Sequence, residues 1–307
     1  KWCGKTTTAS QLANSILRMQ DPSMRDEYLV TAKTKPSILL NGDTPRLIDE
    51  WQDAPMLWDA VRTTVDDRQI PGQFILTGSN AVDKSQIHHS GAGRITRLRM
   101  LPMSLWESKE STGEVSLKEL FNNPDYDIDG KMSKMSIEDL IFAASRGGWP
   151  ASLLARTPKA QLLVAKNYVQ TICLDDISGI DGKRRDAKLT SMILRAYARN
   201  VSTLVKKKSL IDDVISSGEV SCHTDTFDDY VSALEKLFVI QNVSAWCPAI
   251  RSKTAIRSSV KRCFCDPSIP IALLGLSPEA LSMQLKTFGF IFEQMCVRDF
   301  RAYMPDF

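Results

Sequence analysis

The opening segment, KWCGKTT, carries residue types that bind nucleotide phosphates. Gly4, Lys5 and Thr6 form the end of the P-loop pattern G-x-x-x-x-G-K-[ST], and Thr7, directly after them, is also expected to bind the nucleotide. In that pattern the glycines let backbone N–H groups turn toward the phosphates, the lysine reaches the terminal phosphates, and the hydroxyl binds Mg²⁺. The first glycine of the pattern would lie upstream of Lys1. Because Gly-Lys-Thr also occurs by chance, the assignment depends on the motifs downstream in the chain.

A short apolar segment that ends in two acids comes next. Residues 46–52 read RLIDEWQ, which predicts a strand with Asp49 and Glu50 at its carboxyl end. Asp49 would then lie beside Mg²⁺, and Glu50 would polarise the attacking water. A strand that merely runs into a polar loop is the alternative for this segment alone. Its position after Gly-Lys-Thr favours the catalytic interpretation.

A third apolar segment ends in small polar residues. Residues 73–80, QFILTGSN, are predicted as a strand. Ligands of a doubly wound sheet bind at the carboxyl ends of its strands, so Ser79 or Asn80 would contact the terminal phosphate or the water. The alternative, for Ser79 or for Asn80, is that the side chain only ends the strand and contacts no ligand.

Arg94 comes after the flexible sequence Gly-Ala-Gly. Such an arginine could present its guanidinium to a γ-phosphate, either in its own subunit or across a subunit boundary. Residues 95–100 then alternate like a strand.

The spacing of apolar residues predicts the remaining elements. Helices are expected over residues 8–19 and 55–67, with a short strand over 27–31. Further along the chain, helices are expected over 136–146, 158–177, 188–206, 209–222, 224–240 and 282–303, and two strands over 241–246 and 260–265.

The order GKTT, LIDEWQ, FILTGSN and GAGRITRLRMLPMSLWE resembles a family of prokaryotic AAA-type P-loop ATPases that carry a C-terminal domain of unknown function. The resemblance continues nearly to the end of the chain, through residues 147–150, 168–178, 226–240, 264–266 and 289–303. It implies ATP and Mg²⁺ as ligands, with the roles above for Lys5, Thr6, Asp49, Glu50, Ser79 and Arg94. The Walker B strand departs from the family pattern because it is short and carries Arg46. We also expect a fragment cut at both ends.

The expected fold is an α/β P-loop NTPase core of AAA type followed by a helical region and a winged-helix domain. We expect the ATPase domain over 1–105, without its first strand, and the helical domain over 106–205. The winged-helix-like domain is expected over 206–275. Residues 276–307 would be the first helix of a nuclease-like domain.

The expected wing is basic. It carries Arg251, Lys253, Arg257, Lys261 and Arg262, which could contact DNA. However, the helix that would read DNA begins with three acids, Asp225, Asp228 and Asp229, which would repel phosphates. Two roles therefore stay open, a protein-contacting module and a DNA contact made through the wing.

By resemblance, Glu293 would match the acid on the first helix of PD-(D/E)-x-K nucleases. The metal-binding acid and the E-x-K that such chemistry needs are not in this sequence. Glu107-Ser108-Lys109 matches E-x-K by letters only, in the tail of the ATPase region. We therefore predict no nuclease activity.

Composition indicates an ordinary globular chain of 307 residues, with 43% hydrophobic and 24% charged residues and a net charge of +3. No apolar run is long enough for a membrane helix. The seven cysteines, an odd number, suggest reduced thiols in the cytoplasm. The set Cys222, His223, Cys247, Cys263 and Cys265 matches no paired zinc pattern, and the adjacent histidines at 88 and 89 make a poor chelating pair.

These observations together predict an Mg²⁺-dependent ATPase. The absence of an N-K-x-D segment favours ATP over GTP. The alternative is a nucleotide-gated module that docks DNA or protein with little turnover. A homo-oligomer is expected if Arg94 acts across a subunit boundary.

Overall fold

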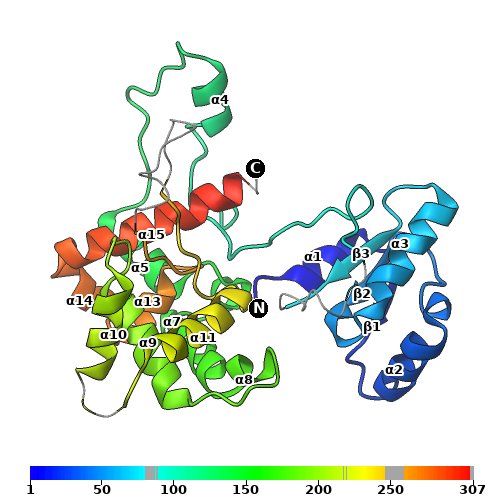
Figure 1. The fold of residues 1–307 in the computed structure, drawn as a ribbon. Helices are drawn as coiled ribbons and strands as arrows, with labels where there is room; N and C mark the ends of the chain where they lie inside the picture. The colour runs from blue at the N-terminus through cyan, green and yellow to red at the C-terminus, as the bar shows by residue number, and fades with distance from the viewer. Residues whose placement is uncertain (80–86, 88, 217, 219, 246–258, 305–307) are drawn as a thin grey trace, which may run out of the picture. The chain divides into compact units, whose positions relative to one another are not determined.

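The computed structural model describes residues 1–79, 87, 89–216, 218, 220–245 and 259–304. The chain divides into two compact units, Lys1–Met100 and Leu101–Phe307. Figure 1 shows the sheet in the first unit and helices throughout the second.

The first unit is built on a sheet of three parallel strands. They are β1 (Ser15–Arg18), β2 (Arg46–Asp49) and β3 (Phe74–Thr77), in the order β1-β2-β3. The register pairs Arg18 with Asp49 and Asp49 with Thr77. Asp49 therefore lies in the middle of the carboxyl edge of the sheet, where parallel α/β folds bind ligands.

Three helices pack on this sheet: α1 (Lys5–Leu12), α2 (Arg25–Thr34) and α3 (Met56–Arg68). Two short 3₁₀ turns, Pro36–Ile38 and Trp51–Asp53, lie between them. Ile48 of β2 shares a hydrophobic core with residues of α2 and α3. Its neighbour Leu47 points to the opposite face and is also fully buried. Helix α1 packs against β2 and β3.

The strands predicted within residues 46–52 and 73–80 are confirmed, although they are shorter, at 46–49 and 74–77, and the helix predicted over 55–67 is confirmed. The helix predicted over 8–19 is wrong beyond Leu12, because residues 15–18 form β1. A short apolar run such as Ile16-Leu17 fits the periodicity of a helix and that of a strand equally well. Asn14, just before β1, favours an end to the helix there.

Two further predictions for this unit are wrong. Residues 27–31, predicted as a strand, lie inside α2. Asp26 and Glu27 occupy the first turn of that helix, where acids interact favourably with the helix dipole. Residues 95–100, predicted as a strand, are irregular. Arg97 of this segment stacks on Trp58 of α3, 5.0 Å from the ring centroid.

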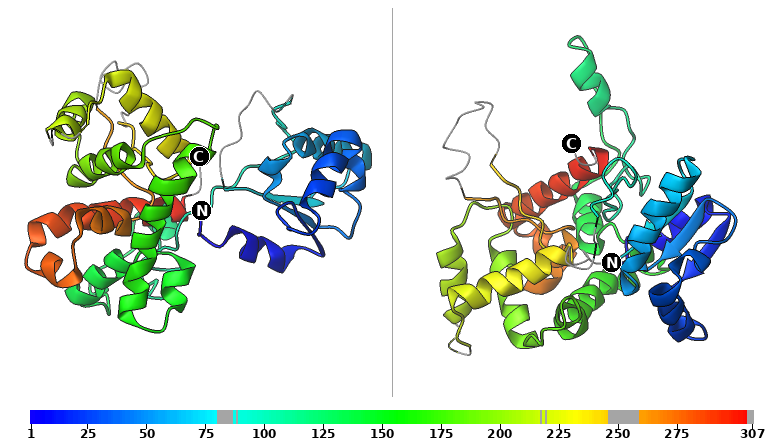
Figure 2. Two further views of the ribbon diagram at one scale, coloured as in Figure 1. Left: turned by 90° about the horizontal axis from the view of Figure 1, so that it is seen from below. Right: turned by 45° about the vertical axis from the view of Figure 1, so that its right-hand side comes forward.

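The second unit is helical (Figures 1 and 2). Its helices are α4 (Leu117–Asn122), α5 (Ile137–Arg146), α6 (Pro150–Leu154), α7 (Pro158–Thr171), α8 (Ile177–Gly179), α9 (Ala187–Arg199), α10 (Lys207–Ile215), α11 (Thr224–Lys236), α13 (Ser268–Leu274), α14 (Pro278–Ser282) and α15 (Leu285–Tyr303). A π-helical turn, Ile172–Asp176, joins α7 to α8. The predicted helices over 136–146, 158–177 and 282–303 are confirmed, while α9, α10 and α11 end several residues before their predicted limits.

One hydrophobic core holds the second unit together. It extends from Ile141 of α5 to Met295 of α15. Tyr197 of α9 is buried in this core, with the ring centroids of Phe227 and Phe264 each 6.3 Å away. This core joins residues on both sides of the boundaries expected at 205 and 275.

Two antiparallel bridges come after α11, where the wing strands are expected. Ile240 pairs with Phe264, and Val243 pairs with Lys261. The basic residues Arg251, Lys253 and Arg257, predicted for the wing, lie outside the described residues.

Candidate nucleotide site

The predicted phosphate loop leads directly into α1. Gly4 precedes the helix with φ of +88°, a left-handed conformation that glycine adopts without steric cost. Among the described residues, no side chain caps this helix. The first N–H groups of α1 are therefore open to an anion, and the helix dipole favours one there.

Lys5 and Thr7 lie in the first turn of α1. The Lys5 ammonium is 3.9 Å from the sulfur of Cys3, and the Cys3 thiol is 3.6 Å from the carbonyl of Met100. Cys3 is buried, whereas Lys5 is half-buried and Thr7 is exposed. Lys5 is thus accessible at the start of the helix, as a phosphate-binding lysine requires.

The Asp49 carboxylate joins three elements of the first unit. Thr6 of α1 donates to Asp49 Oδ1 over 2.7 Å, and Thr77 of β3 donates to the same oxygen over 2.6 Å. A hydroxyl and a carboxylate side by side are hard oxygen ligands of the kind Mg²⁺ uses. The predicted metal ligands Thr6 and Asp49 are therefore in contact, although they lie far apart in the sequence.

Glu50 directly follows β2 and has a left-handed conformation, with φ of +55°. Ser79 Oγ lies 2.8 Å from Glu50 Oε1 and 2.9 Å from Oε2. The Gln52 amide also donates to Oε2. Left-handed backbone costs a non-glycine residue roughly 1 kcal/mol and is concentrated at functional sites. The conformation directs the carboxylate toward Ser79, while Asn80 lies outside the described residues.

Arg94 is not brought to this cluster. Its Nε donates to Asp66 Oδ1 over 2.8 Å. This hydrogen bond raises the pKa of Arg94 and lowers the pKa of Asp66. Asp66 lies near the end of α3, where Arg68 stacks on Phe74 at the start of β3. Arg94 therefore lies toward the amino edge of the sheet, opposite Asp49.

Arg46, the residue that departs from the family pattern, also lies at the amino edge. Its guanidinium donates to Ser15 Oγ over 2.9 Å and to the Leu39 carbonyl over 3.0 Å. Burial lowers its pKa. Arg46 therefore does not alter the carboxyl edge of the sheet, where the candidate site lies.

The sequence-based prediction assigned no role at the site to three residues: Gln52, Thr77 and Gly78. Thr77 offered a signal, because a hydroxyl residue at a strand end lies at the ligand edge of a parallel sheet. Gln52 offered only its position after Asp-Glu-Trp. A Cβ at Gly78 would lie 2.6 Å from Gln52 Oε1, so this glycine leaves room for the amide.

In the second unit, Lys261 and Arg262 of the expected wing contact other residues of the same unit. Lys261 forms an ion pair with Glu293, the acid compared above with nuclease sites. Arg262 donates to the Val205 carbonyl over 3.2 Å and lies 5.6 Å from the ring centroid of Tyr197. Both basic residues are therefore engaged within the unit.

Two of the acids at the start of α11 are also paired. Lys207 contacts Asp228 over 2.9 Å, and Arg185 contacts Asp229 over 2.9 Å. Arg185 also binds Asp181 with two hydrogen bonds and lowers its pKa to about 2. Intramolecular ion pairs thus offset part of the negative charge that argued against DNA.

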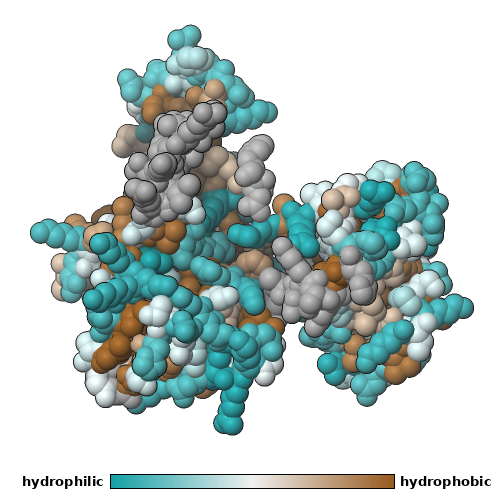
Figure 3. Space-filling view, in the orientation of Figure 1, coloured by the Kyte–Doolittle hydropathy of each residue, from teal (hydrophilic) through white to brown (hydrophobic). Residues whose placement is uncertain are grey.

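No group of three or more His, Cys, Asp and Glu side chains within the described residues is arranged to hold a metal ion. The described cysteines are free thiols, and Cys247 lies outside that part of the chain. No described helix is long and apolar enough to cross a membrane. Figure 3 shows hydrophilic and hydrophobic side chains mixed over the visible surface of each unit.

Comparison with known proteins identifies two segments. Residues 1–109 match the family model of an AAA domain, and residues 137–280 match that of a domain of unknown function, DUF8612. No curated protein and no solved structure matches the chain. The family match and the small parallel sheet with its helices support an AAA-type ATPase domain with an α/β P-loop core, followed by a domain of unknown function.

Proposed function

We propose that this protein binds ATP with Mg²⁺ at the carboxyl edge of the sheet and hydrolyses it. The observation that carries the proposal is the contact of Thr6 and Thr77 with one oxygen of Asp49, beside Glu50. Three elements thereby supply a phosphate-binding helix, a pair of metal ligands and a carboxylate base. An AAA domain match over the same residues supports this function.

Each residue has one role in the proposed reaction. Lys5 and the first N–H groups of α1 hold the phosphates, and Thr6 and Asp49 hold Mg²⁺, which neutralises phosphate charge when bound. Glu50 accepts a proton from the attacking water. Ser79 donates to the terminal phosphate, with Asn80 as the second candidate for that contact.

Arg94 has a different position in the proposal. Because it pairs with Asp66 at the opposite edge of the sheet, it is better placed to reach a nucleotide held by a second copy of the chain. We therefore propose that Arg94 stabilises transition-state charge across a boundary between two copies. This role needs a homo-oligomer.

Lys5→Ala tests the proposed site, with Lys33→Ala on the exposed side of α2 as a matched control. We expect Lys5→Ala to lower steady-state phosphate release at least about a hundredfold, because the ammonium neutralises charge that develops on the phosphates. Lys33→Ala should match the native rate. The measurement is phosphate release with ATP and Mg²⁺, on protein shown to be folded by circular dichroism. Equal rates in all three proteins would contradict the proposal.

A second candidate is a nucleotide-gated binding module formed by residues 206–275. The antiparallel bridges at Ile240 and Val243, placed directly after α10 and α11, fit a winged helix. Any DNA contact would then fall to Arg251, Lys253 and Arg257, since Lys261 and Arg262 are engaged internally. The affinity for duplex DNA, measured by titration at two salt concentrations, distinguishes a DNA partner from a protein partner. Affinity that falls steeply with salt indicates contacts with DNA phosphates.

A further inference from the structure

The Glu50 carboxylate is held from two sides. Ser79 Oγ lies within 2.9 Å of both its oxygens, and the Gln52 amide donates to Oε2. Ser79 comes from the end of β3, whereas Gln52 lies one residue beyond Trp51 on the same turn as Glu50. The two donors therefore reach the carboxylate from the segments that follow two different strands.

The orientation of the Gln52 amide follows from which of its two ends can donate a hydrogen bond to a carboxylate. Its carbonyl oxygen is buried, and no donor within the described residues reaches it. The opposite orientation would point that carbonyl at the Glu50 carboxylate, placing two acceptors in contact. A buried acceptor without a donor costs about 1–3 kcal/mol. The amide thus keeps its NH₂ group on Glu50 although its own carbonyl gains no partner.

The two donors differ in whether they can stay hydrogen-bonded to Glu50 once a nucleotide phosphate binds. A serine hydroxyl carries one hydrogen, so Ser79 cannot donate to Glu50 and to a phosphate oxygen at the same time. Gln52 has no such conflict, because its NH₂ group is already directed at the carboxylate. When Ser79 turns to phosphate, Gln52 is the donor that remains on Glu50 among the contacts described.

We infer that Gln52 is the positioning residue of the catalytic carboxylate: its amide holds Glu50 in place when the Ser79 hydroxyl transfers to the terminal phosphate. This inference rests on the proposed ATPase function. Gly78 belongs to the same arrangement, since any side chain there would press on the Gln52 carbonyl.

Gln52→Glu is the decisive variant, because it keeps the size of the side chain and removes the donor. We expect kcat to fall by about tenfold or more while KM and the affinity for a fluorescent ATP analogue stay within about twofold. Protonation restores a donor to the introduced carboxyl, so the ratio of variant to native kcat should rise as pH falls. Because the introduced carboxylate also places a negative charge beside Glu50, the uncharged Gly78→Ala variant is needed to separate loss of the donor from repulsion.

Gln20→Glu is the matched control. Gln20 also donates its amide to a carboxylate of the same unit, Asp53, over 3.1 Å, but on an exposed surface. It should retain the native kcat. Gly78→Ala provides an independent approach, because the added methyl group displaces the Gln52 amide without changing its chemistry. We expect it to lower kcat in the same way.

The results separate this inference from the function on which it rests. If Lys5→Ala abolishes phosphate release but Gln52→Glu and Gly78→Ala retain the native kcat, the positioning role is wrong and the ATPase function stands. If Lys5→Ala also retains the native rate, the ATPase function itself is wrong.

Discussion

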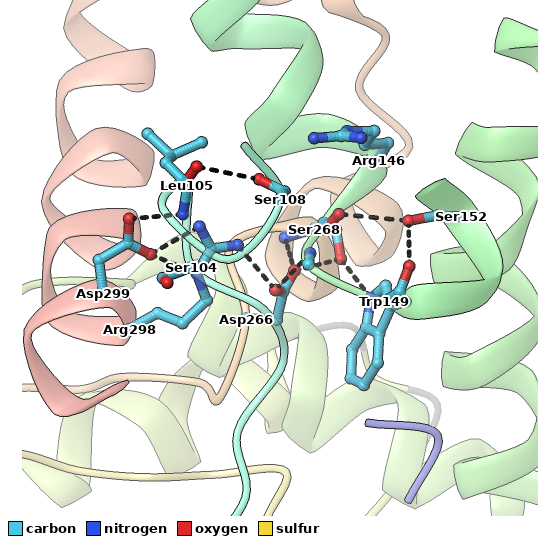
Figure 4. Close-up of polar contacts among 12 residues, drawn as sticks. Ser104, Leu105, Ser108, Arg146, Trp149, Ser152, Asp266, Ser268, Arg298 and Asp299 are labelled. Atoms are coloured by element: carbon cyan, nitrogen blue, oxygen red, sulfur yellow. Dashed lines mark hydrogen bonds and ion pairs between the residues drawn. The ribbon is translucent and has the colours of Figure 1, made fainter. Parts of the chain in front are cut away.

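The two units each contain a cluster of carboxylates and hydroxyls, but the clusters differ in burial and in the charge of their partners. In the first unit, Asp49 and Glu50 are half-buried, and they accept hydrogen bonds from neutral hydroxyl and amide groups. In the second unit, Asp266 is fully buried and faces the Arg298 guanidinium over 3.1 Å. Figure 4 shows this second cluster.

The buried cluster ties distant segments together. Asp266 accepts hydrogen bonds from the backbone N–H groups of Gly148 and Ser268, each over 2.9 Å. Arg298 also donates to Asp299, which accepts from the N–H of Leu105 over 3.1 Å. Burial raises the pKa of Asp299, whereas for Arg298 the two carboxylates outweigh burial and raise the pKa.

The comparison shows why similar residue types serve different purposes. A sealed carboxylate with a charged partner cannot exchange that partner without leaving a buried charge, so it holds the fold together. A carboxylate at a strand edge with hydroxyl partners can exchange them for a ligand at little cost. Burial and partner charge, rather than residue type, distinguish the candidate site from the structural cluster.

The largest expected effect on stability comes from breaking the buried cluster. Arg298→Met should lower the free energy of unfolding of the second unit by about 3–5 kcal/mol, because Asp266 and Asp299 lose their counter-ion. Hydrogen exchange of the second unit in a urea series measures this change.

The control for that variant is Arg199→Met. Arg199 pairs with Asp213 on the surface, where the two side chains are 47% and 28% exposed. We expect a loss of less than about 1 kcal/mol for this exposed pair. Equal losses in the two variants would contradict the contrast drawn between buried and exposed pairs.

A smaller effect is expected from a glycine that closes the same cluster. A Cβ at Gly148 would lie 2.1 Å from the backbone oxygen of Met103. Because backbone cannot move aside as a side chain can, Gly148→Ala should destabilise the second unit by about 1–3 kcal/mol. The urea midpoint of that unit provides the measurement.

Gly289→Ala is the matched control, since a Cβ there meets no atom of the described chain within 4 Å. Gly289 lies inside α15, where alanine has the higher helix propensity. We expect this change to stabilise the unit by up to about 1 kcal/mol. A stabilising effect of Gly148→Ala would show that residues 103 and 148 are not packed as the structure describes.

The two strands that carry the candidate site could be predicted from the sequence, whereas three other elements of the first unit were predicted wrongly. The strand ending in Asp49 and the strand ending in Thr77 each have an apolar run closed by polar residues. Parallel pairing then brings their ends together without further information. Thr6 reaches the same edge because the phosphate-loop helix begins there.

Side-chain partners chosen by tertiary packing could not be predicted. Arg94 pairs with Asp66, a surface contact that leaves no periodic signal in the sequence. Gly148 donates its N–H to Asp266, which lies far along the chain. Likewise, the sequence predicts a basic wing at Lys261 and Arg262, because their contacts with Glu293 and Val205 depend on the fold.

The most direct test of the proposed chemistry is steady-state phosphate release by Glu50→Gln with ATP and Mg²⁺. The substitution keeps the size of the side chain and removes the base, so we expect a fall in kcat of about a hundredfold or more. The affinity for a fluorescent ATP analogue and the unfolding midpoint of the first unit should stay close to native. Native phosphate release by this variant would contradict the claim that the strand-edge carboxylate, unlike the buried one, performs the chemistry.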